Sequence, residues 1–158
     1  MQFGIGFDIH PLVAGRKLVL GGVEITFDRG LDGWSDADVL THAIIDALLG
    51  AAAMGDIGMH FPPGKPEYKN VSSLKLLAEI KGKMTDNGWQ INNIDTTVIA
   101  EKPHLREYID IMRERLQKTL GIPIDQVSVK ASTANQVGAL CHEEAIAALA
   151  IASIEKTK

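Results

Sequence analysis

The chain has 158 residues, of which 46% are apolar and 23% are charged. This length suits one domain and this apolar content suits a packed core, which argues against an intrinsically disordered chain. No apolar run reaches the roughly 18 residues of a membrane span, and the first residues lack the basic start of a signal peptide. The net charge of −4 argues against a broad nucleic-acid interface, and a single cysteine, Cys141, excludes an internal disulfide. We therefore expect one cytoplasmic domain over residues 1–158, with neither a membrane nor a nucleic acid as partner.

The first part of the chain predicts a strand, a hairpin and a helix. Residues 4–10 alternate between apolar side chains and a second set that contains Asp8 and His10, which is the period of a half-buried strand. Two β-prone runs then flank Gly21-Gly22, a dipeptide typical of a tight hairpin. A helix is expected from Ser35, whose hydroxyl can cap free backbone N–H groups, to about residue 49.

The rest of the chain alternates between helices and strands. Amphipathic patterns ended by glycines predict helices over residues 71–87 and 104–120, and β-branched runs predict strands over 93–101 and 127–133. Residues 143–154 are ambiguous, because their alanines favour a helix while their apolar pattern fixes no period. The order of the elements predicts a β-α-β type α/β domain.

Three residues are candidates for metal binding. Asp8 and His10 lie two apart on the predicted strand, so their side chains point the same way and can meet at one ion. His42 lies on the predicted helix with Asp38 and Asp46 at i−4 and i+4, and a carboxylate beside a ligating imidazole fixes its tautomer. Other readings stay open on spacing alone: a solvent-facing Asp–His hydrogen bond, and a packed histidine in the helix.

The chain resembles the 2-C-methyl-D-erythritol 2,4-cyclodiphosphate synthase family from end to end. No single motif is specific to this family, but the order and spacing of seven motifs together are highly specific. The anchors are Gly6-Phe7-Asp8-Ile9-His10, Gly21-Gly22-Val23, residues 35–43 from Ser35 to Ala43, residues 46–51 from Asp46 to Ala51, Gly55-Asp56-Ile57-Gly58, Phe61-Pro62 and Val129-Lys130-Ala131-Ser132-Thr133.

The resemblance implies an architecture and a reaction. The expected fold is a single α/β (α+β) domain with a mixed four-stranded sheet packed on helices and a β-α-β-α-β-β core, with residues 143–154 as a strand. Three copies would form a homotrimer with the sheets facing the three-fold axis and the active sites between subunits. The reaction converts 4-diphosphocytidyl-2-C-methyl-D-erythritol 2-phosphate to 2-C-methyl-D-erythritol 2,4-cyclodiphosphate and CMP in the non-mevalonate isoprenoid pathway. This lyase activity is an intramolecular phosphoryl transfer, attributed mainly to positioning and charge neutralisation.

The resemblance also implies roles for individual residues. Asp8, His10 and His42 match zinc ligands, and Mg²⁺ or Mn²⁺ would bind with the substrate diphosphate. Thr133 matches a residue that stabilises the transition state, and Trp34 occupies the position of another. The positions implied in substrate binding are Asp8, His10, Trp34, Ser35, Asp56, Gly58, Phe61, Ala100, Pro103, His104, Leu105, Arg106, Ala131, Ser132, Thr133, Asn135 and His142.

Several residues depart from the family pattern. Trp34 replaces a histidine, Pro63 an acidic residue, and Asn135 an acidic residue near the second metal. Ala139 and His142 replace a phenylalanine and an arginine at the axial cavity, the suggested site of an isoprenoid phosphate. An indole N–H can donate one hydrogen bond but cannot carry positive charge. The alternative to a working synthase is therefore a catalytically weak relative that binds a cytidine nucleotide or an isoprenoid phosphate.

Overall fold

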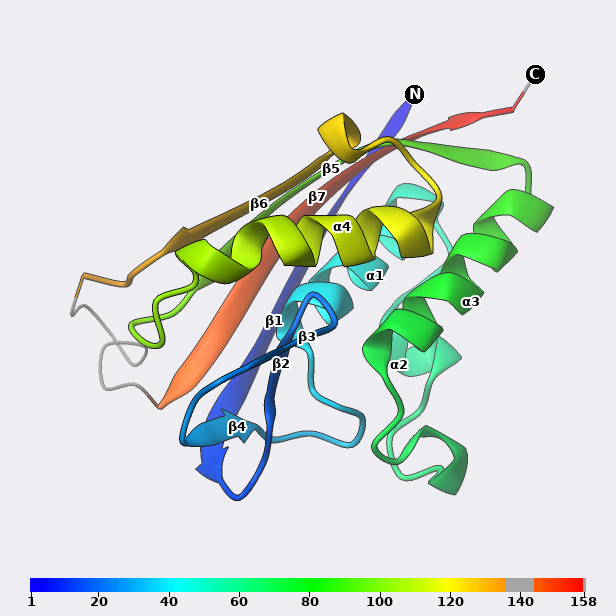
Figure 1. Ribbon diagram of the computed structural model, residues 1–158. Helices are drawn as coiled ribbons and strands as arrows, with labels where there is room; N and C mark the ends of the chain where they lie inside the picture. The colour runs from blue at the N-terminus through cyan, green and yellow to red at the C-terminus, as the bar shows by residue number, and fades with distance from the viewer. Residues whose placement is uncertain (136–143, 158) are drawn as a thin grey trace.

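A mixed five-stranded sheet forms the centre of the computed structural model, which describes residues 1–135 and 144–157 (Figure 1). The strands run in the order β4-β1-β7-β5-β6; only β5 and β6 are parallel. Their bounds are β1 Gln2–Ala14, β4 Arg29–Leu31, β5 Trp89–Ile99, β6 Val127–Ser132 and β7 Ala145–Lys156. The expected four strands were one too few, because the three residues of β4 pair with the far end of β1. A separate hairpin of β2 (Leu18–Leu20) and β3 (Val23–Ile25) confirms the turn predicted at Gly21-Gly22.

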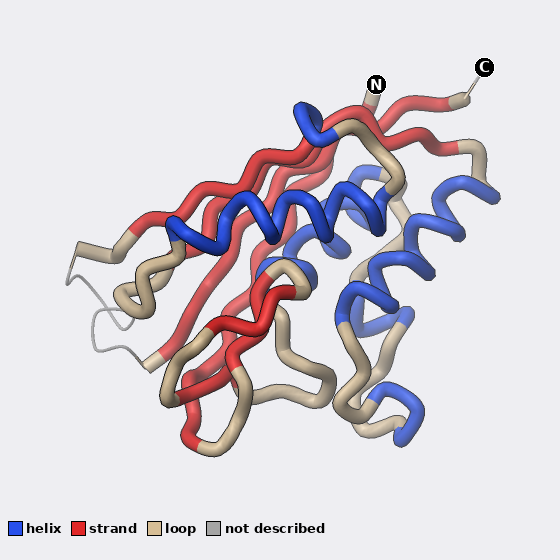
Figure 2. Tube along the Cα trace, viewed as in Figure 1, coloured by secondary structure: helices blue, strands red, loops and turns tan. Residues whose placement is uncertain are grey.

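Three long helices cover one face of this sheet (Figure 2). They are α1 (Val39–Ala51), α3 (Ser73–Asp86) and α4 (Ile109–Leu120), with a short α2 (Ile57–His60) and single 3₁₀ turns at Pro66–Tyr68, Arg106–Tyr108 and Ile124–Gln126. The predicted start of α1 at Ser35 was wrong. Ala37 has a φ of 57°, which a right-handed helix cannot contain, and Asp38 caps the helix by accepting the N–H of Thr41. Within the described ranges, no helix is both long and apolar enough to cross a membrane.

Helix α1 lies directly on β1 because glycines remove the side chains between them. A Cβ atom on Gly4 would lie 2.0 Å from the carbonyl oxygen of Ala47, and one on Gly6 only 1.9 Å from that of Ala43. Both contacts are far shorter than van der Waals distances and involve helix backbone. The close approach places the next residues of β1, Asp8 and His10, beside the first turns of α1.

The last strand, β7, is central in the sheet despite its alanines. It pairs with β1 on one side and with β5 on the other. Ala148, Ala150 and Ala152 are buried, and small side chains at these positions let α1 pack close to the sheet. The strand expected from the family resemblance is therefore confirmed, since tertiary packing overrides the helical propensity of alanine.

The other face of the sheet carries exposed apolar side chains. Phe3, Ile5, Phe7 and Ile9 alternate along β1 with 67%, 71%, 53% and 45% of their surface exposed. Across the register, Ile5 lies opposite Ile151 and Phe7 opposite Leu149. The alternation of β1 therefore correctly predicts a strand with two different faces. Within one chain, however, the face that packs against a helix is the one that carries the glycines, and the apolar face is exposed.

Candidate metal centre

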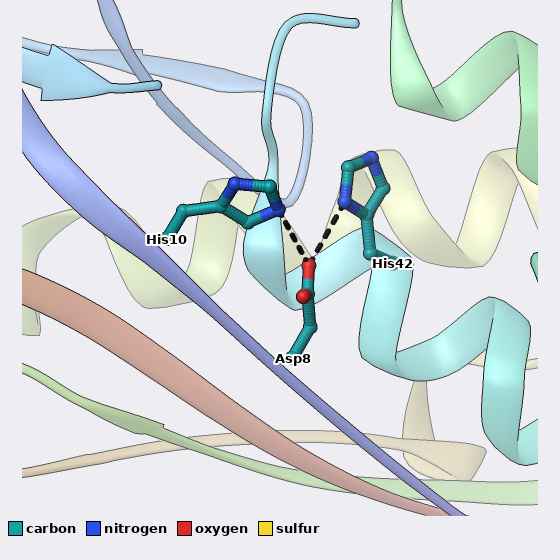
Figure 3. A group of neighbouring side chains, drawn as sticks. All are labelled: Asp8, His10 and His42. Carbon is teal, nitrogen blue, oxygen red and sulfur yellow. Dashed lines mark hydrogen bonds and ion pairs between the residues drawn. The ribbon is translucent and has the colours of Figure 1, made fainter. Parts of the chain in front are cut away.

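Asp8, His10 and His42 converge at the junction of β1 and α1 (Figure 3). One potential ligand atom from each lies within 4.8 Å of the other two. The Oδ2 atom of Asp8 is 2.9 Å from Nε2 of His10 and 2.9 Å from Nδ1 of His42. Two imidazole nitrogens and a carboxylate oxygen are a donor set typical of catalytic zinc, which leaves a fourth position for water or substrate.

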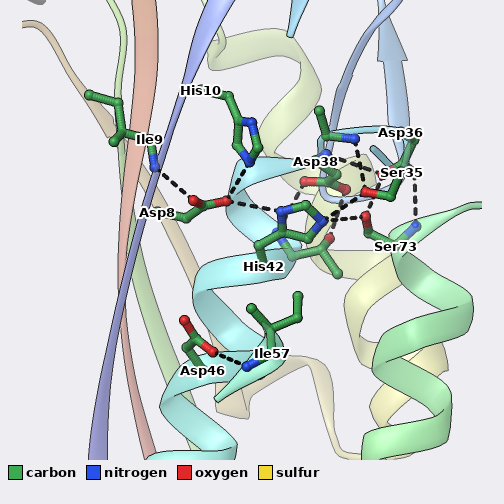
Figure 4. Close-up of polar contacts among 12 residues, drawn as sticks. Asp8, Ile9, His10, Ser35, Asp36, Asp38, His42, Asp46, Ile57 and Ser73 are labelled. Carbon is green, nitrogen blue, oxygen red and sulfur yellow. Dashed lines mark hydrogen bonds and ion pairs between the residues drawn. The ribbon is translucent and has the colours of Figure 1, made fainter. Parts of the chain in front are cut away.

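The outward-facing nitrogen of each ring has its own partner, which fixes the orientation of the ring; Figure 4 shows the partners of His42. Nδ1 of His10 lies 2.6 Å from the carbonyl oxygen of Asp32 and must donate to it. Nε2 of His42 lies 3.1 Å from Oγ of Ser35 and 2.9 Å from Oγ of Ser73. Metal-binding histidines commonly have this arrangement, with one nitrogen on the ion and the other hydrogen-bonded to protein. The residues present therefore fit a divalent metal.

Asp8 and His10 shift each other's pKa in opposite directions. Burial raises the pKa of Asp8, but hydrogen bonds to His10 and His42 outweigh it and hold that pKa well below its ordinary value. Burial lowers the pKa of His10, while the hydrogen bond to Asp8 outweighs it and raises that pKa. The carboxylate is thus ionised at neutral pH, as a metal ligand must be.

Asp38 and Asp46, the two carboxylates expected to orient His42, accept hydrogen bonds from other residues instead. Asp38 accepts hydrogen bonds from the backbone of Gly21, Gly22 and Thr41 and from the Thr41 hydroxyl. Asp46 accepts the N–H of Ile57 at 2.7 Å. The sequence spacing was therefore misleading: Asp38 ties the hairpin to α1, and Asp46 holds the start of α2. The residues that the sequence reasoning missed are Asp32, Ser73 and Asp36, whose carboxylate accepts the hydroxyl of Ser73.

A cavity of about 240 Å³ opens beside the cluster. Its walls include Asp8, His10, His42 and the predicted substrate contacts Trp34, Ser35, Gly58 and Phe61, together with Ile57, Pro63, Tyr68 and Leu76. The indole N–H of Trp34 donates to the carbonyl of Lys65 at 2.8 Å. The one donor that the tryptophan offers is thus used to hold the loop before the 3₁₀ turn at Pro66–Tyr68.

The predicted ribose contacts lie at the start of α2. Asp56 is exposed and caps this helix by accepting the N–H of Met59 at 2.9 Å, while Gly58 lines the cavity. A Cβ atom on Gly58 would be 3.3 Å from the carboxylate of Asp56, so the two residues lie side by side. The turn reading and the binding reading of Asp56 are therefore compatible, since the cap uses one of its two carboxylate oxygens.

A second pocket, of about 190 Å³, forms where β5 and β6 end. It brings together two segments predicted to bind substrate, and it contains Ala100, Glu101, Pro103, His104, Leu105, Arg106, Ala131, Ser132 and Thr133. At the edge of this pocket, the hydroxyl of Thr133 donates to the side-chain oxygen of Asn135 at 3.1 Å.

The two pockets lie on different parts of the sheet. The register places Asp8 opposite Ala148, Ala148 opposite Val98, and Val98 opposite Ala131. Three strand spacings therefore separate Asp8 from Ala131, about 14 Å at roughly 4.8 Å each. The predicted contact His142 and the axial position Ala139 lie outside the described residues, so the axial cavity and its isoprenoid phosphate stay predictions.

Comparisons with known proteins agree over the whole chain. Residues 1–155 match a family model described as the YgbB family. The chain is 53% identical to 2-C-methyl-D-erythritol 2,4-cyclodiphosphate synthase of Dehalococcoides mccartyi, with 99% of each chain covered. Its fold is similar to the bifunctional IspDF of Campylobacter jejuni (TM-score 0.95, 35% identity), covering 99% of this chain and 42% of that one. It is also similar to a CDP complex of IspF from Plasmodium falciparum (TM-score 0.87, 28% identity), covering 99% of this chain and 97% of that one.

Proposed function

The chain belongs to the YgbB family and has the activity of its curated relatives, 2-C-methyl-D-erythritol 2,4-cyclodiphosphate synthase, and we propose that Asp8, His10 and His42 hold the catalytic metal. The observation that carries this proposal is the convergence of their three donor atoms within 4.8 Å. The bonded outer nitrogens support it, because each ring is already turned to present its other nitrogen. Zn²⁺ suits this donor set, and when bound it would supply Lewis-acid polarisation of phosphate oxygens.

The reaction is a cyclisation within one substrate molecule. An oxygen of the 2-phosphate attacks the β-phosphorus, the bond from that phosphorus to the oxygen bridging to the α-phosphorus breaks, and CMP leaves with that oxygen. The protein needs no nucleophile for this step, so its contribution is to position the two phosphates and to neutralise charge.

The residues around the metal centre suit that positioning role. Ser35 is buried in the cavity wall beside His42, so its hydroxyl is placed for a substrate phosphate. Phe61 and Tyr68 meet edge to face, with ring centroids 5.4 Å apart, and give the cavity an apolar wall that limits water. Gly58 lines the same cavity and Asp56 lies beside it, so the two offer an open backbone and a carboxylate to the hydroxyls of a ribose.

We place the cytidine end of the substrate in the second pocket, supplied by a neighbouring subunit. CDP is the ligand named for the Plasmodium falciparum relative. The backbone at Ala100–Arg106 and the hydroxyls of Ser132 and Thr133 offer hydrogen bonds to a base and to phosphates. Mg²⁺ or Mn²⁺ would be held with the diphosphate near Asn135, which can contribute a carbonyl oxygen but no charge.

A homotrimer would join the two pockets and cover the apolar sheet face. Contiguous exposed apolar side chains usually mark a protein interface. On the face of the sheet opposite the three long helices, five exposed apolar side chains lie together: Phe3, Ile5, Phe7, Leu149 and Ile151. Three copies packed through this face would bury it and bring each metal centre beside a partner's β6 edge.

A subunit-complementation assay tests the shared site. His42→Ala removes a metal ligand and Thr133→Ala alters the second pocket, so each variant alone should lose most of its turnover. When the two are unfolded and reassembled together at equal amounts, about a quarter of the sites should combine two intact halves, because a head-to-tail interface pairs unlike surfaces. Recovered CMP release at about that level supports the shared site. If each variant alone is weak and CMP release does not recover after mixing of the chains has been verified, both pockets of one site must belong to the same chain.

A further inference from the structure

We propose that Ser73 and Asp36 are positioning residues that anchor Nε2 of His42 as a hydrogen-bond donor and so direct Nδ1 at the metal. This inference rests on the proposed function only in that His42 is taken as a metal ligand. Ser73 is the first residue of α3, and Asp36 lies in the loop before α1. Neither residue lines the cavity, so both would act through the imidazole ring.

The hydrogen-bond partners of Ser73 require a hydrogen on Nε2 of His42 (Figure 4). The hydroxyl of Ser73 donates to Oδ1 of Asp36, since a carboxylate can only accept. A serine hydroxyl carries one hydrogen, so Oγ of Ser73 can offer only lone pairs to Nε2 of His42, 2.9 Å away. Nε2 must then carry a hydrogen. Nδ1, on the other side of the ring, faces Asp8 at 2.9 Å, so it is the atom that would ligate a metal while Nε2 keeps its hydrogen.

Asp36 is itself held rigidly. Its Oδ2 accepts the backbone N–H of Ser73 at 2.9 Å, and its Oδ1 accepts that of Asp38 at 3.1 Å. Its own N–H donates to the carbonyl of Val71 at 3.0 Å. The Asp36 carboxylate therefore joins the start of α3 to the loop before α1. By accepting both the backbone N–H and the hydroxyl of Ser73, it also holds the Ser73 oxygen against Nε2 of His42.

The two serines on Nε2 of His42 face different surroundings. Ser73 is fully buried and is committed to Asp36. Ser35 lines the cavity and accepts the N–H of Ala37 at 3.2 Å. We assign orientation of the ring to Ser73 and contact with substrate to Ser35, so substitution of Ser73 should affect the metal site before it affects substrate contacts.

The test combines zinc affinity with a direct reading of the tautomer. Ser73→Ala removes the nearer of the two hydroxyls on Nε2, and zinc affinity measured by competition with a chromogenic chelator should fall by roughly 10- to 100-fold. Asp36→Asn should cause a smaller loss in the same direction, because an amide oxygen accepts the Ser73 hydroxyl more weakly than a carboxylate does. Thr96→Val is the matched control: Thr96 is 1% exposed and donates to the carbonyl of Ser128 at 2.9 Å, remote from the cluster. This variant should keep the zinc affinity of the wild type.

Nitrogen-15 NMR of the zinc-loaded wild type reads the His42 ring directly. With zinc bound, His42 should ligate through Nδ1 and keep its proton on Nε2. Ligation of zinc through Nε2 overturns the inference, and so does an unchanged zinc affinity in folded Ser73→Ala. An equal loss in Thr96→Val would also overturn it, because the effect would then be a general loss of stability. A wild type that binds no zinc at His42 would instead contradict the proposed function.

Discussion

The two sides of β1 meet different surroundings and serve different purposes. One side carries Gly4 and Gly6, which let α1 approach to backbone contact, and then Asp8 and His10, which face His42 on that helix. The other side carries Ile5 and Phe7, which are more than half exposed in the single chain. Within the described residues the first side is covered by α1, whereas the second is left open to the proposed contact with another copy. A single strand thus connects metal binding with the proposed assembly.

The largest effect is expected from placing a side chain between β1 and α1, where their backbones are in contact. Gly6→Ala would place a Cβ atom 1.9 Å from the carbonyl oxygen of Ala43, so the helix or the strand must move. Overpacking of this kind costs about 1–3 kcal/mol, and here the obstacle is backbone. Denaturant unfolding should show a loss at the upper end of that range or beyond, accompanied by weakened zinc binding.

Gly82→Ala in α3 is the control for Gly6→Ala. A Cβ atom there meets open space, and alanine is the better helix former by about 0.8–1 kcal/mol. This variant should be at least as stable as the wild type. Equal stability of Gly6→Ala and Gly82→Ala would show that α1 does not depend on contact with the glycine side.

The second prediction concerns the metal ligands. His42→Ala should reduce bound zinc to a small fraction of the wild-type content and abolish turnover, because one of three protein ligands is lost. Circular dichroism should still show the native fold. His60→Gln is the control, since His60 bonds the carbonyl of Met54 outside the cluster, and its zinc content should be normal. Full zinc content in His42→Ala would remove His42 from the ligand set.

The third prediction addresses the apolar side. Ile5→Asp places a charge on a residue that is 71% exposed in the chain, so it should leave the fold and zinc binding intact while preventing assembly. Light scattering should then give the mass of a single chain. Ile111→Asp, on an exposed isoleucine of α4, should keep the mass of the wild type. A trimeric Ile5→Asp would show that copies do not pack through this face.

The smallest effect is expected at Trp34. Its N–H is bonded to Lys65, so the indole supplies loop contact and apolar surface instead of charge. Trp34→His should therefore change turnover by less than about tenfold, in either direction, since an imidazole can donate a similar hydrogen bond. Steady-state kinetics measure this directly. A collapse of turnover would mean that the indole ring has a role that a smaller ring cannot fill.

Local sequence signals predicted the elements whose geometry is set by neighbouring residues. The hairpin at Gly21-Gly22 and the end of α4 at Gly121, which has a φ of 69°, follow from glycine alone. The start of α1 was missed because nothing in the local pattern signals the positive φ of Ala37. The strand β7 needed the family resemblance, since its alanines are favoured there only by contact with α1.

The same distinction applies to the site. Asp8 and His10 could be predicted as a pair because strand geometry fixes their direction. Ser73 could not, because its contact with His42 joins residues 31 apart and depends on how α3 packs against α1. Asp38 and Asp46 show the opposite error: helical spacing placed them near His42, but backbone N–H groups bind both carboxylates.

A phosphorus NMR assay tests the central claim, that this chain is a synthase whose metal is held by Asp8, His10 and His42. Purified protein is incubated with 4-diphosphocytidyl-2-C-methyl-D-erythritol 2-phosphate and Mg²⁺, before and after removal of zinc by a selective chelator, and again after zinc is restored. We expect the cyclic diphosphate and CMP to appear, to stop with the chelator and to return with zinc. Unchanged substrate from zinc-loaded protein, or undiminished turnover in protein verified to be free of zinc, would contradict the account.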